Sequence, residues 1–175
     1  THYSAHHAAF YRSLGASIGT RIVVTRAGDV IPKVLRLAPG EQPDPKLPIP
    51  EHCPSCGSLL IMRSGKVLEC HNASCPPKLR KALDYFAARD NMDIEGLGER
   101  TVYLFTEAGL LADVADIYQL DFDRVRQFEG FGDISVANLE RAIEASKSRP
   151  LANLLVALSI RYLGGTGSRV LARAM

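Results

Sequence analysis

The chain has 175 residues, a formal net charge of +2 and a hydrophobic content of 46%. These values are normal for a soluble globular protein of one domain or two small ones. The charge is too small to establish nucleic-acid binding by itself, so a nucleic-acid surface would need its basic residues on one face. No run of 18 or more apolar residues occurs, so the sequence predicts no membrane span.

The ends of the sequence indicate an internal piece of a longer protein. The first residue is Thr1 and no charged-then-apolar leader follows it. Met175 falls partway through the third of three repeats described below. We therefore expect further domains on both sides.

Residues 1–38 begin with a histidine-rich apolar stretch and continue as two β-branched runs. Residues 21–25 and 30–35 are typical of strands, and Ala27-Gly28-Asp29 between them is typical of a turn. Pro32 favours a sheet edge or a bulge for the second run. Two strands do not make a stable sheet alone, so we expect more strands upstream.

Residues 39–51 contain five prolines. Such a composition is typical of an extended, semi-rigid linker. We therefore predict a domain boundary in this segment.

All four cysteines lie within residues 52–76, with the spacing Cys53-x2-Cys56-x13-Cys70-x4-Cys75. The residues between the pairs predict a hairpin that turns at Ser64-Gly65 and returns the second pair to the first. Four thiolates close a tetrahedron around Zn²⁺ and leave no position for water, so the predicted site is structural.

Two disulfides or an iron–sulfur cluster are the alternatives to zinc. Clustered cysteines suit a reducing, intracellular protein with a metal site better than a secreted disulfide framework. So small a hairpin also has little core without a metal. His52 and His71 adjoin ligands and are interpreted as bystanders.

Residues 77–175 have helical periodicity that is interrupted by glycines. Gly96, Gly130 and Gly164 fall at equal intervals of 34 residues. A glycine turn between two helices exposes backbone N–H groups at the start of the second helix, which suits a phosphate. The pattern therefore predicts a row of phosphate contacts on a nucleic-acid backbone. The predicted helices cover residues 79–88, 101–108, 123–128, 135–146, 151–160 and 168–174.

Each turn is expected to carry an apolar anchor two residues before its first glycine, namely Ile94, Phe128 or Tyr162. The first two turns have a second glycine, Gly98 or Gly132. The third turn lacks an apolar residue between its glycines, which lowers the expectation of a phosphate contact there. The alternative is that such glycines only end helices and allow close packing.

Several basic residues lie near these turns and could neutralise neighbouring phosphates, or could simply keep helix faces soluble. Interleaved aromatic and basic residues suited to single strands are not prominent, so we predict contact with duplex backbone and no base readout. The residues are Lys78, Arg80, Lys81, Arg100, Arg126, Arg161 and Arg169.

Four consecutive motifs, covering nearly all of the chain, resemble the C-terminal half of bacterial NAD⁺-dependent DNA ligases. They correspond to the end of an oligonucleotide-binding (OB) barrel, a four-cysteine zinc finger and a helix-hairpin-helix domain. Ser159 stands where that family commonly has glycine. The matching segments are residues 26–34, residues 53–57 with Cys70 and Cys75, Gly96-Leu97-Gly98, Phe131-Gly132 with residues 142–147, and residues 157–161.

The resemblance implies a nick-sealing enzyme that transfers AMP from NAD⁺ to a lysine and then to a 5′-phosphate. The Lys-x-Asp-Gly adenylation motif is absent here, so the fragment is expected to bind duplex DNA without sealing it. No catalytic residue is assigned, and NAD⁺ and Mg²⁺ would bind other domains. A fourth hairpin and a BRCT-type domain are expected after Met175.

The resulting prediction is a multidomain protein with α and small β parts. Residues 1–38 would be the end of an OB fold, 39–51 a linker, 52–76 a zinc-ribbon-like finger with four cysteine ligands, and 77–175 a truncated, all-α tandem helix-hairpin-helix domain. By the resemblance, the finger would join the barrel to the hairpins. The expected ligands of zinc are Cys53, Cys56, Cys70 and Cys75, and the expected DNA contacts are Arg26, Gly96, Gly98, Arg100, Gly130, Gly132 and Gly164.

We predict a monomer of the bacterial cytoplasm that binds nicked duplex DNA during replication and repair. One alternative is a non-enzymatic duplex-binding helix-hairpin-helix and zinc module of a repair protein. A second alternative is a structural zinc module that binds another protein.

Overall fold

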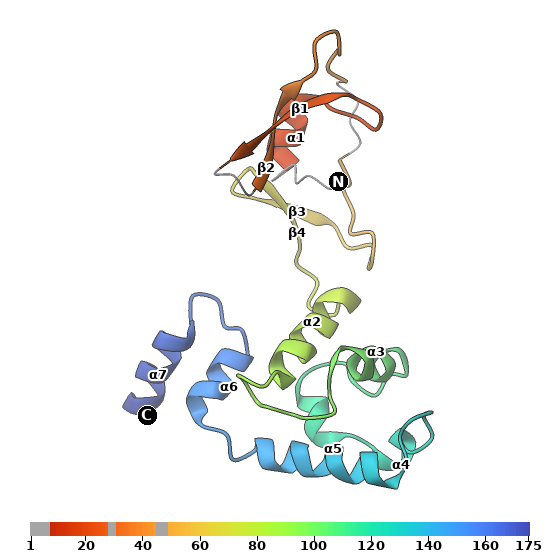
Figure 1. Ribbon diagram of the computed structural model, residues 1–175. Coiled ribbons are helices and arrows are strands. Elements are labelled where there is room, and N and C mark those ends of the chain that lie inside the picture. The colour runs from red at the N-terminus through yellow and green to blue at the C-terminus, as the bar shows by residue number, and fades with distance from the viewer. Residues whose placement is uncertain (1–7, 28–30, 45–48) are drawn as a thin grey trace. The chain divides into compact units, whose positions relative to one another are not determined.

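A computed structural model describes residues 8–27, 31–44 and 49–175. The chain divides into two compact units, Thr1–Asn72 and Ala73–Met175 (Figure 1). The first unit holds two small antiparallel sheets and the second is helical. None of the helices in the described ranges is long and apolar enough to cross a membrane.

The first unit begins with a helix that the sequence analysis did not predict, α1 (Ala8–Leu14). It is followed by β1 (Ile22–Ala27) and β2 (Ile31–Leu37), which pair antiparallel and confirm the two predicted strands. Among the described residues β2 pairs with β1 alone, so Pro32 lies in an edge strand, as expected for a residue without an N–H donor. The predicted turn at Gly28 and Asp29 lies outside the described residues.

The start of the proline-rich segment contacts the part of the first unit that connects α1 to β1. The Asp44 N–H donates to the carbonyl of Gly15 at 2.7 Å. Arg21 forms an ion pair with Glu41 at 2.7 Å. The described first part of this segment is therefore held by specific contacts, although its prolines favour an extended backbone.

The second hairpin consists of β3 (Leu60–Arg63) and β4 (Val67–Cys70) and confirms the one predicted from the sequence. Ser64 and Gly65 both have positive φ, at 52° and 66°. The Lys66 N–H donates to the carbonyl of Arg63 at 3.0 Å. The strands pair Arg63 with Val67 and Leu60 with Cys70, so residues 64–66 form a three-residue loop between them.

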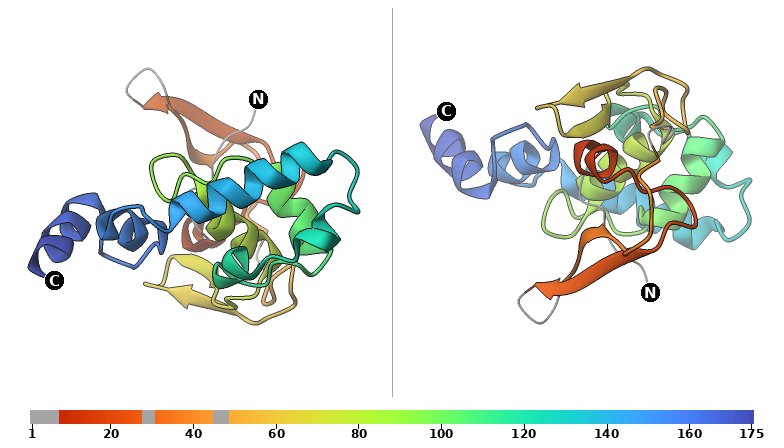
Figure 2. Two further views of the ribbon diagram at one scale, coloured as in Figure 1. Left: turned by 90° about the horizontal axis from the view of Figure 1, so that it is seen from below. Right: turned by 90° about the horizontal axis from the view of Figure 1, so that it is seen from above.

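The helical unit confirms every helix predicted from the sequence, with ends shifted by a few residues. The helix α2 packs against α3 and α6, and α6 and α7 lie side by side (Figure 2). The elements are α2 (Pro76–Ala87), α3 (Glu99–Glu107), the 3₁₀ helix η1 (Ala115–Gln119), α4 (Phe122–Val125), α5 (Asp133–Ser146), α6 (Leu151–Ala157) and α7 (Gly165–Ala174).

One hydrophobic core runs through the helical unit, and aromatic rings occupy its centre. Phe105 of α3 is fully buried, and its ring lies 5.9 Å from that of Phe128 and 5.3 Å from that of Phe131. Tilted aromatic pairs at these separations add to the stabilisation from buried area. Phe105 therefore joins α3 to the turn between α4 and α5.

Replacing Phe105 with Ala should lower the free energy of unfolding by about 3–5 kcal/mol, because it removes a buried ring and leaves a cavity. Ile134→Ala, at a position that is 80% exposed, is the control and should change stability by less than about 0.5 kcal/mol. Urea unfolding followed by circular dichroism measures both. A small loss for Phe105→Ala would contradict the assignment of this core.

Candidate functional site

The helical unit contains three five-residue turns with the same backbone hydrogen bond. We call residues 94–98 the first turn, 128–132 the second and 160–164 the third. In each, the N–H of the fourth residue donates to the carbonyl of the first. The three bonds are Leu97 to Ile94 at 3.2 Å, Phe131 to Phe128 at 3.1 Å, and Leu163 to Ile160 at 3.0 Å.

The third residue of each turn adopts a left-handed backbone. Gly96 and Gly130 have φ of 91° and 89°, and Tyr162 has φ of 67°. Glycine enters this region without steric cost, whereas a bulky residue there is an outlier. The first two turns therefore have the residue that the geometry favours, and the third does not.

The last residue of each turn is a glycine that caps the following helix. Gly98, Gly132 and Gly164 are the N-caps of α3, α5 and α7, all with extended backbone. Their carbonyls accept hydrogen bonds from the fourth residue of each helix, at 2.9–3.0 Å. Those three donors are buried and are Val102, Val136 and Ser168.

This geometry corrects the register predicted for the third turn. Gly164 corresponds to Gly98 and Gly132, not to Gly96 and Gly130, so the spacing of equivalent glycines is 34 and then 32 residues. The equal intervals found in the sequence join glycines that are not equivalent, because Gly96 and Gly130 are third in their turns whereas Gly164 is last. Leu163 is the apolar residue that the sequence analysis found missing, because it is the fourth residue of the turn and makes the shared hydrogen bond.

The structure also corrects one of the three predicted anchors. Ile94 is buried at 3% exposure, and Phe128 packs on Phe105, as predicted. Tyr162 is 93% exposed and anchors nothing in the core. The sequence analysis missed that Gly164 aligns with Gly98 and Gly132. That alignment places the start of the third turn at Ile160.

Ser159 also has a left-handed backbone, with φ of 51°. It follows the C-cap of α6, Leu158, and donates its N–H to the carbonyl of Val156 at 2.9 Å. Helices often end with a left-handed residue at this position, and glycine is the usual choice. Serine is therefore the strained choice at this position.

The three turns differ in the charges beside them. Glu99 and Asp133 lie in the first turns of α3 and α5, whereas α7 has no acidic residue there. Arg126 contacts Asp123 at 2.6 Å and Asp133 at 3.7 Å. Arg100 is exposed in the first turn of α3.

The other predicted basic residues have varied surroundings. Lys81 lies 3.9 Å from Glu99, and Arg169 donates to Thr166 at 3.3 Å. Arg80 bonds Glu107 and stacks on Tyr103 in a packing arrangement, with 4.4 Å between guanidinium and ring centroid. Lys78 begins the helical unit, and the side chain of Arg26 lies outside the described residues.

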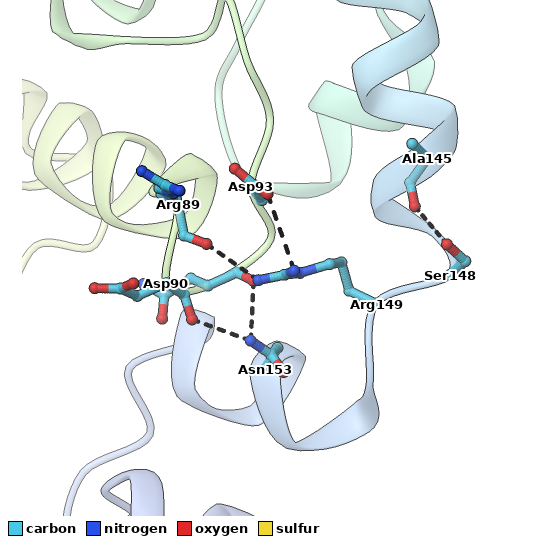
Figure 3. A network of polar contacts seen from close by, with 8 residues as sticks. Arg89, Asp90, Asp93, Ala145, Ser148, Arg149 and Asn153 are labelled. Atoms are coloured by element: carbon cyan, nitrogen blue, oxygen red, sulfur yellow. Dashed lines mark hydrogen bonds and ion pairs between the residues drawn. The ribbon is translucent and has the colours of Figure 1, made fainter.

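A polar network holds the loop that leads into the first turn (Figure 3). Arg149, between α5 and α6, donates to the carbonyls of Asn91 at 3.0 Å and Arg89 at 3.1 Å. Asn153 of α6 donates to the carbonyl of Asp90 at 3.0 Å. Since unpaired backbone carbonyls are costly, these side chains fix the loop before residues 94–98.

The four cysteines form a group with the ligand spacing of a metal site. Their sulfur atoms all lie within 4.8 Å of one another, and the Cys56 and Cys70 sulfurs are 3.6 Å apart. The Gly57 N–H donates to the carbonyl of Cys53 at 2.8 Å, and Gly57 has the positive φ of 71° that this tight turn needs. The group can hold a metal ion such as zinc.

The surroundings of two of these cysteines favour the thiolate, the form that binds metals. Hydrogen bonding to the hydroxyl and backbone of Ser58 lowers the pKa of Cys56 to about 6. Backbone hydrogen bonds of Ser55 and Cys56 lower the pKa of Cys53. The group consists of the four cysteines, and His52 and His71 are outside it.

Comparison with known proteins shows what the chain is similar to. The chain is 46% identical over 164 residues to a DNA ligase of Thermomicrobium roseum, covering 92% of the chain and 24% of that protein. It is 42% identical over 166 residues to a DNA ligase of Persephonella marina, covering 93% of the chain and 23% of the relative. The chain is homologous to part of a DNA ligase.

The homology covers nearly the whole chain but only a fraction of its relatives. A DNA ligase of Synechococcus sp. (strain RCC307) is 40% identical over 172 residues, which are 97% of the chain and 26% of that ligase. The chain thus spans about a quarter of the length of the ligases it matches. No protein-family model matches it.

Replacing Cys56 with Ser should lower both the bound zinc per chain, measured by atomic emission spectroscopy, and the melting temperature, because a tetrahedral thiolate site loses one ligand. Ser55→Ala, an exposed change in the same loop, is the control and should leave both unchanged. An unchanged melting temperature for Cys56→Ser would contradict a structural role for the metal.

Proposed function

We propose that the chain is the duplex-gripping part of an NAD⁺-dependent DNA ligase that seals single-strand nicks. The support comes from homology to DNA ligases together with three turns that share one backbone geometry. NAD⁺ and Mg²⁺ would bind parts of the ligase outside this chain. The chain alone would bind nicked duplex as a monomer, in the bacterial cytoplasm, without sealing it.

The observation that carries this proposal is the open space beside the turn glycines. A Cβ atom added to Gly98, Gly130, Gly132 or Gly164 would have no heavy atom within 4 Å. Only at Gly96 would it meet a neighbour, Leu139, and then at an ordinary 3.6 Å. Close helix packing therefore does not require these glycines. Positive φ favours glycine at Gly96 and Gly130, whereas Gly98, Gly132 and Gly164 are extended, and their lack of a side chain leaves the backbone open to a partner.

Within this proposal, the exposed N–H groups at the starts of α3, α5 and α7 bind phosphates of the duplex. The proposed contacts remain Gly96, Gly98, Arg100, Gly130, Gly132 and Gly164, with Arg26 as a further contact from the first unit. Glu99 and Asp133 oppose an anion at the first two turns, so Arg100 and Arg126 would have to offset them.

The remaining assignments are part of the same proposal. The cysteine group would hold a structural Zn²⁺. Residues 1–38 would end an OB fold, 39–51 would be a linker, 52–76 a zinc finger, and 77–175 a helix-hairpin-helix domain. The shared backbone of the three turns supports the last of these assignments.

Binding of the zinc-loaded chain to a fluorescein-labelled nicked duplex tests the proposal, by anisotropy across a salt series. We expect affinity that falls steeply with salt and does not depend on base sequence, because phosphate contacts release counterions. Absence of binding at low salt by a folded, zinc-loaded chain would contradict the proposal.

Gly132→Val is the sharpest single test of the turns. Gly132 has an extended backbone that valine can adopt, whereas Gly130 and Gly96 have positive φ, so valine there would strain the fold. We expect roughly tenfold weaker duplex binding, since a branched side chain blocks approach to backbone N–H groups. Ala137→Val, exposed in the same helix, is the control and should bind like the unaltered chain. Equal losses of stability and binding for Gly132→Val would mean that the glycine serves folding alone.

A further inference from the structure

We propose that Tyr162, together with Arg161, forms a contact in the third turn that extends beyond the phosphates, where the ring packs on a sugar or on the face of a base of the duplex. This inference rests on the proposed function, in which the three turns face DNA. It assigns to the third turn a role that the first two cannot perform, because they carry glycine at the equivalent position.

The position of Tyr162 is defined by the shared turn geometry. It is the third residue of its turn, equivalent to Gly96 and Gly130. In the first two turns the equivalent residue is glycine and has no side chain. At the third turn, any partner that follows the same approach meets the tyrosine ring first.

The conformation of Tyr162 is costly and the fold does not use the ring. Its φ of 67° is in a region that bulky residues rarely adopt, and its side chain is 93% exposed. Strained residues of this kind persist at ligand contacts and similar functional positions. Burial of the ring does not offset this strain, because the residue is almost fully exposed in the part of the chain that the structure describes.

The chemistry at this tip suits nucleic acid. The guanidinium of Arg161 lies 5.2 Å from the centroid of the Tyr162 ring. Within the described ranges, no carboxylate lies at ion-pair distance from Arg161, and α7 has no acid in its first turn. An exposed ring with an adjacent uncompensated cation can stack on bases or pack on sugars while the cation neutralises a phosphate.

A comparison with Tyr103 shows what an arginine–tyrosine pair looks like when it serves packing. Tyr103 lies in the regular helix α3 and stacks with Arg80 of α2. That arginine also contacts Thr106 and Glu107 of α3. The Tyr162 pair has a strained backbone and no such carboxylate partner in the described residues. The two pairs therefore differ in backbone strain and in whether the arginine is already neutralised by a carboxylate.

The decisive variant is Tyr162→Gly, because folding and binding should change in opposite directions. Glycine relieves the left-handed strain and recreates the glycine of the first two turns, so the melting temperature should rise. Loss of the ring should weaken binding to a nicked duplex by roughly tenfold. The slope of log affinity against log salt should stay unchanged, since a ring releases no counterions.

Ser159→Gly is the matched control. It relieves a positive φ in the same connection, at 51°, without touching the ring. It should raise the melting temperature and leave binding unchanged.

Three further variants test the ring and the cation separately. Tyr162→Phe should keep the affinity, because it retains the ring, and Arg161→Gln should reduce the slope of log affinity against log salt by about one. Tyr162→Asn, which tolerates a left-handed backbone, repeats the test if the glycine variant folds poorly.

The outcomes separate this inference from the proposed function. Tyr162→Gly that binds as tightly as the unaltered chain, while Gly132→Val binds weakly, would overturn the inference and leave the duplex-gripping proposal standing. No binding by the unaltered chain would overturn both. Weaker binding for Tyr162→Gly, with Ser159→Gly unaffected, is the result that we expect.

Discussion

One backbone hydrogen bond, repeated in three turns, organises the helical unit. It runs from the fourth residue of each turn to the carbonyl of the first, and the third residue is left-handed in all three turns. The last residue is then extended and caps the next helix, so the bond determines where α3, α5 and α7 begin. The exposed N–H groups at those starts, on which the proposed duplex contacts depend, follow from it.

The same constraint decides what each following helix buries. The residue whose N–H bonds the capping glycine also directs its side chain into the core, and it is Val102, Val136 or Ser168. The Ser168 hydroxyl is buried without a hydrogen-bond partner among the described residues. The third helix pair therefore keeps the backbone of the other two while its core is less apolar. Equivalent backbones with different side chains allow the three turns to make different contacts.

The cysteine group depends on a separate and more local device. The three-residue loop at residues 64–66 joins β3 and β4 in the register that places Cys70 opposite Leu60, and the tight turn at Gly57 brings Cys53 and Cys56 to one side. Hydrogen bonding to Ser58 then favours the thiolate of Cys56. A hairpin of this size buries little apolar surface, so a bound metal would supply stability that its own core cannot.

The sequence by itself determined the local features, because spacing and residue type act over a few positions. The cysteine spacing, the hairpin at Ser64-Gly65 and the helices between glycines all followed from short-range rules. Helix α1 was not predicted, because its short apolar segment has no N-cap residue and no clear helical periodicity. Only the tertiary structure decided the register of the third turn and the exposure of Tyr162, since equal glycine spacing does not show which glycine caps a helix. The contacts of Arg149 with the loop at residues 89–91 likewise join positions 58 and 60 residues apart, and such pairing depends on packing that no local pattern encodes.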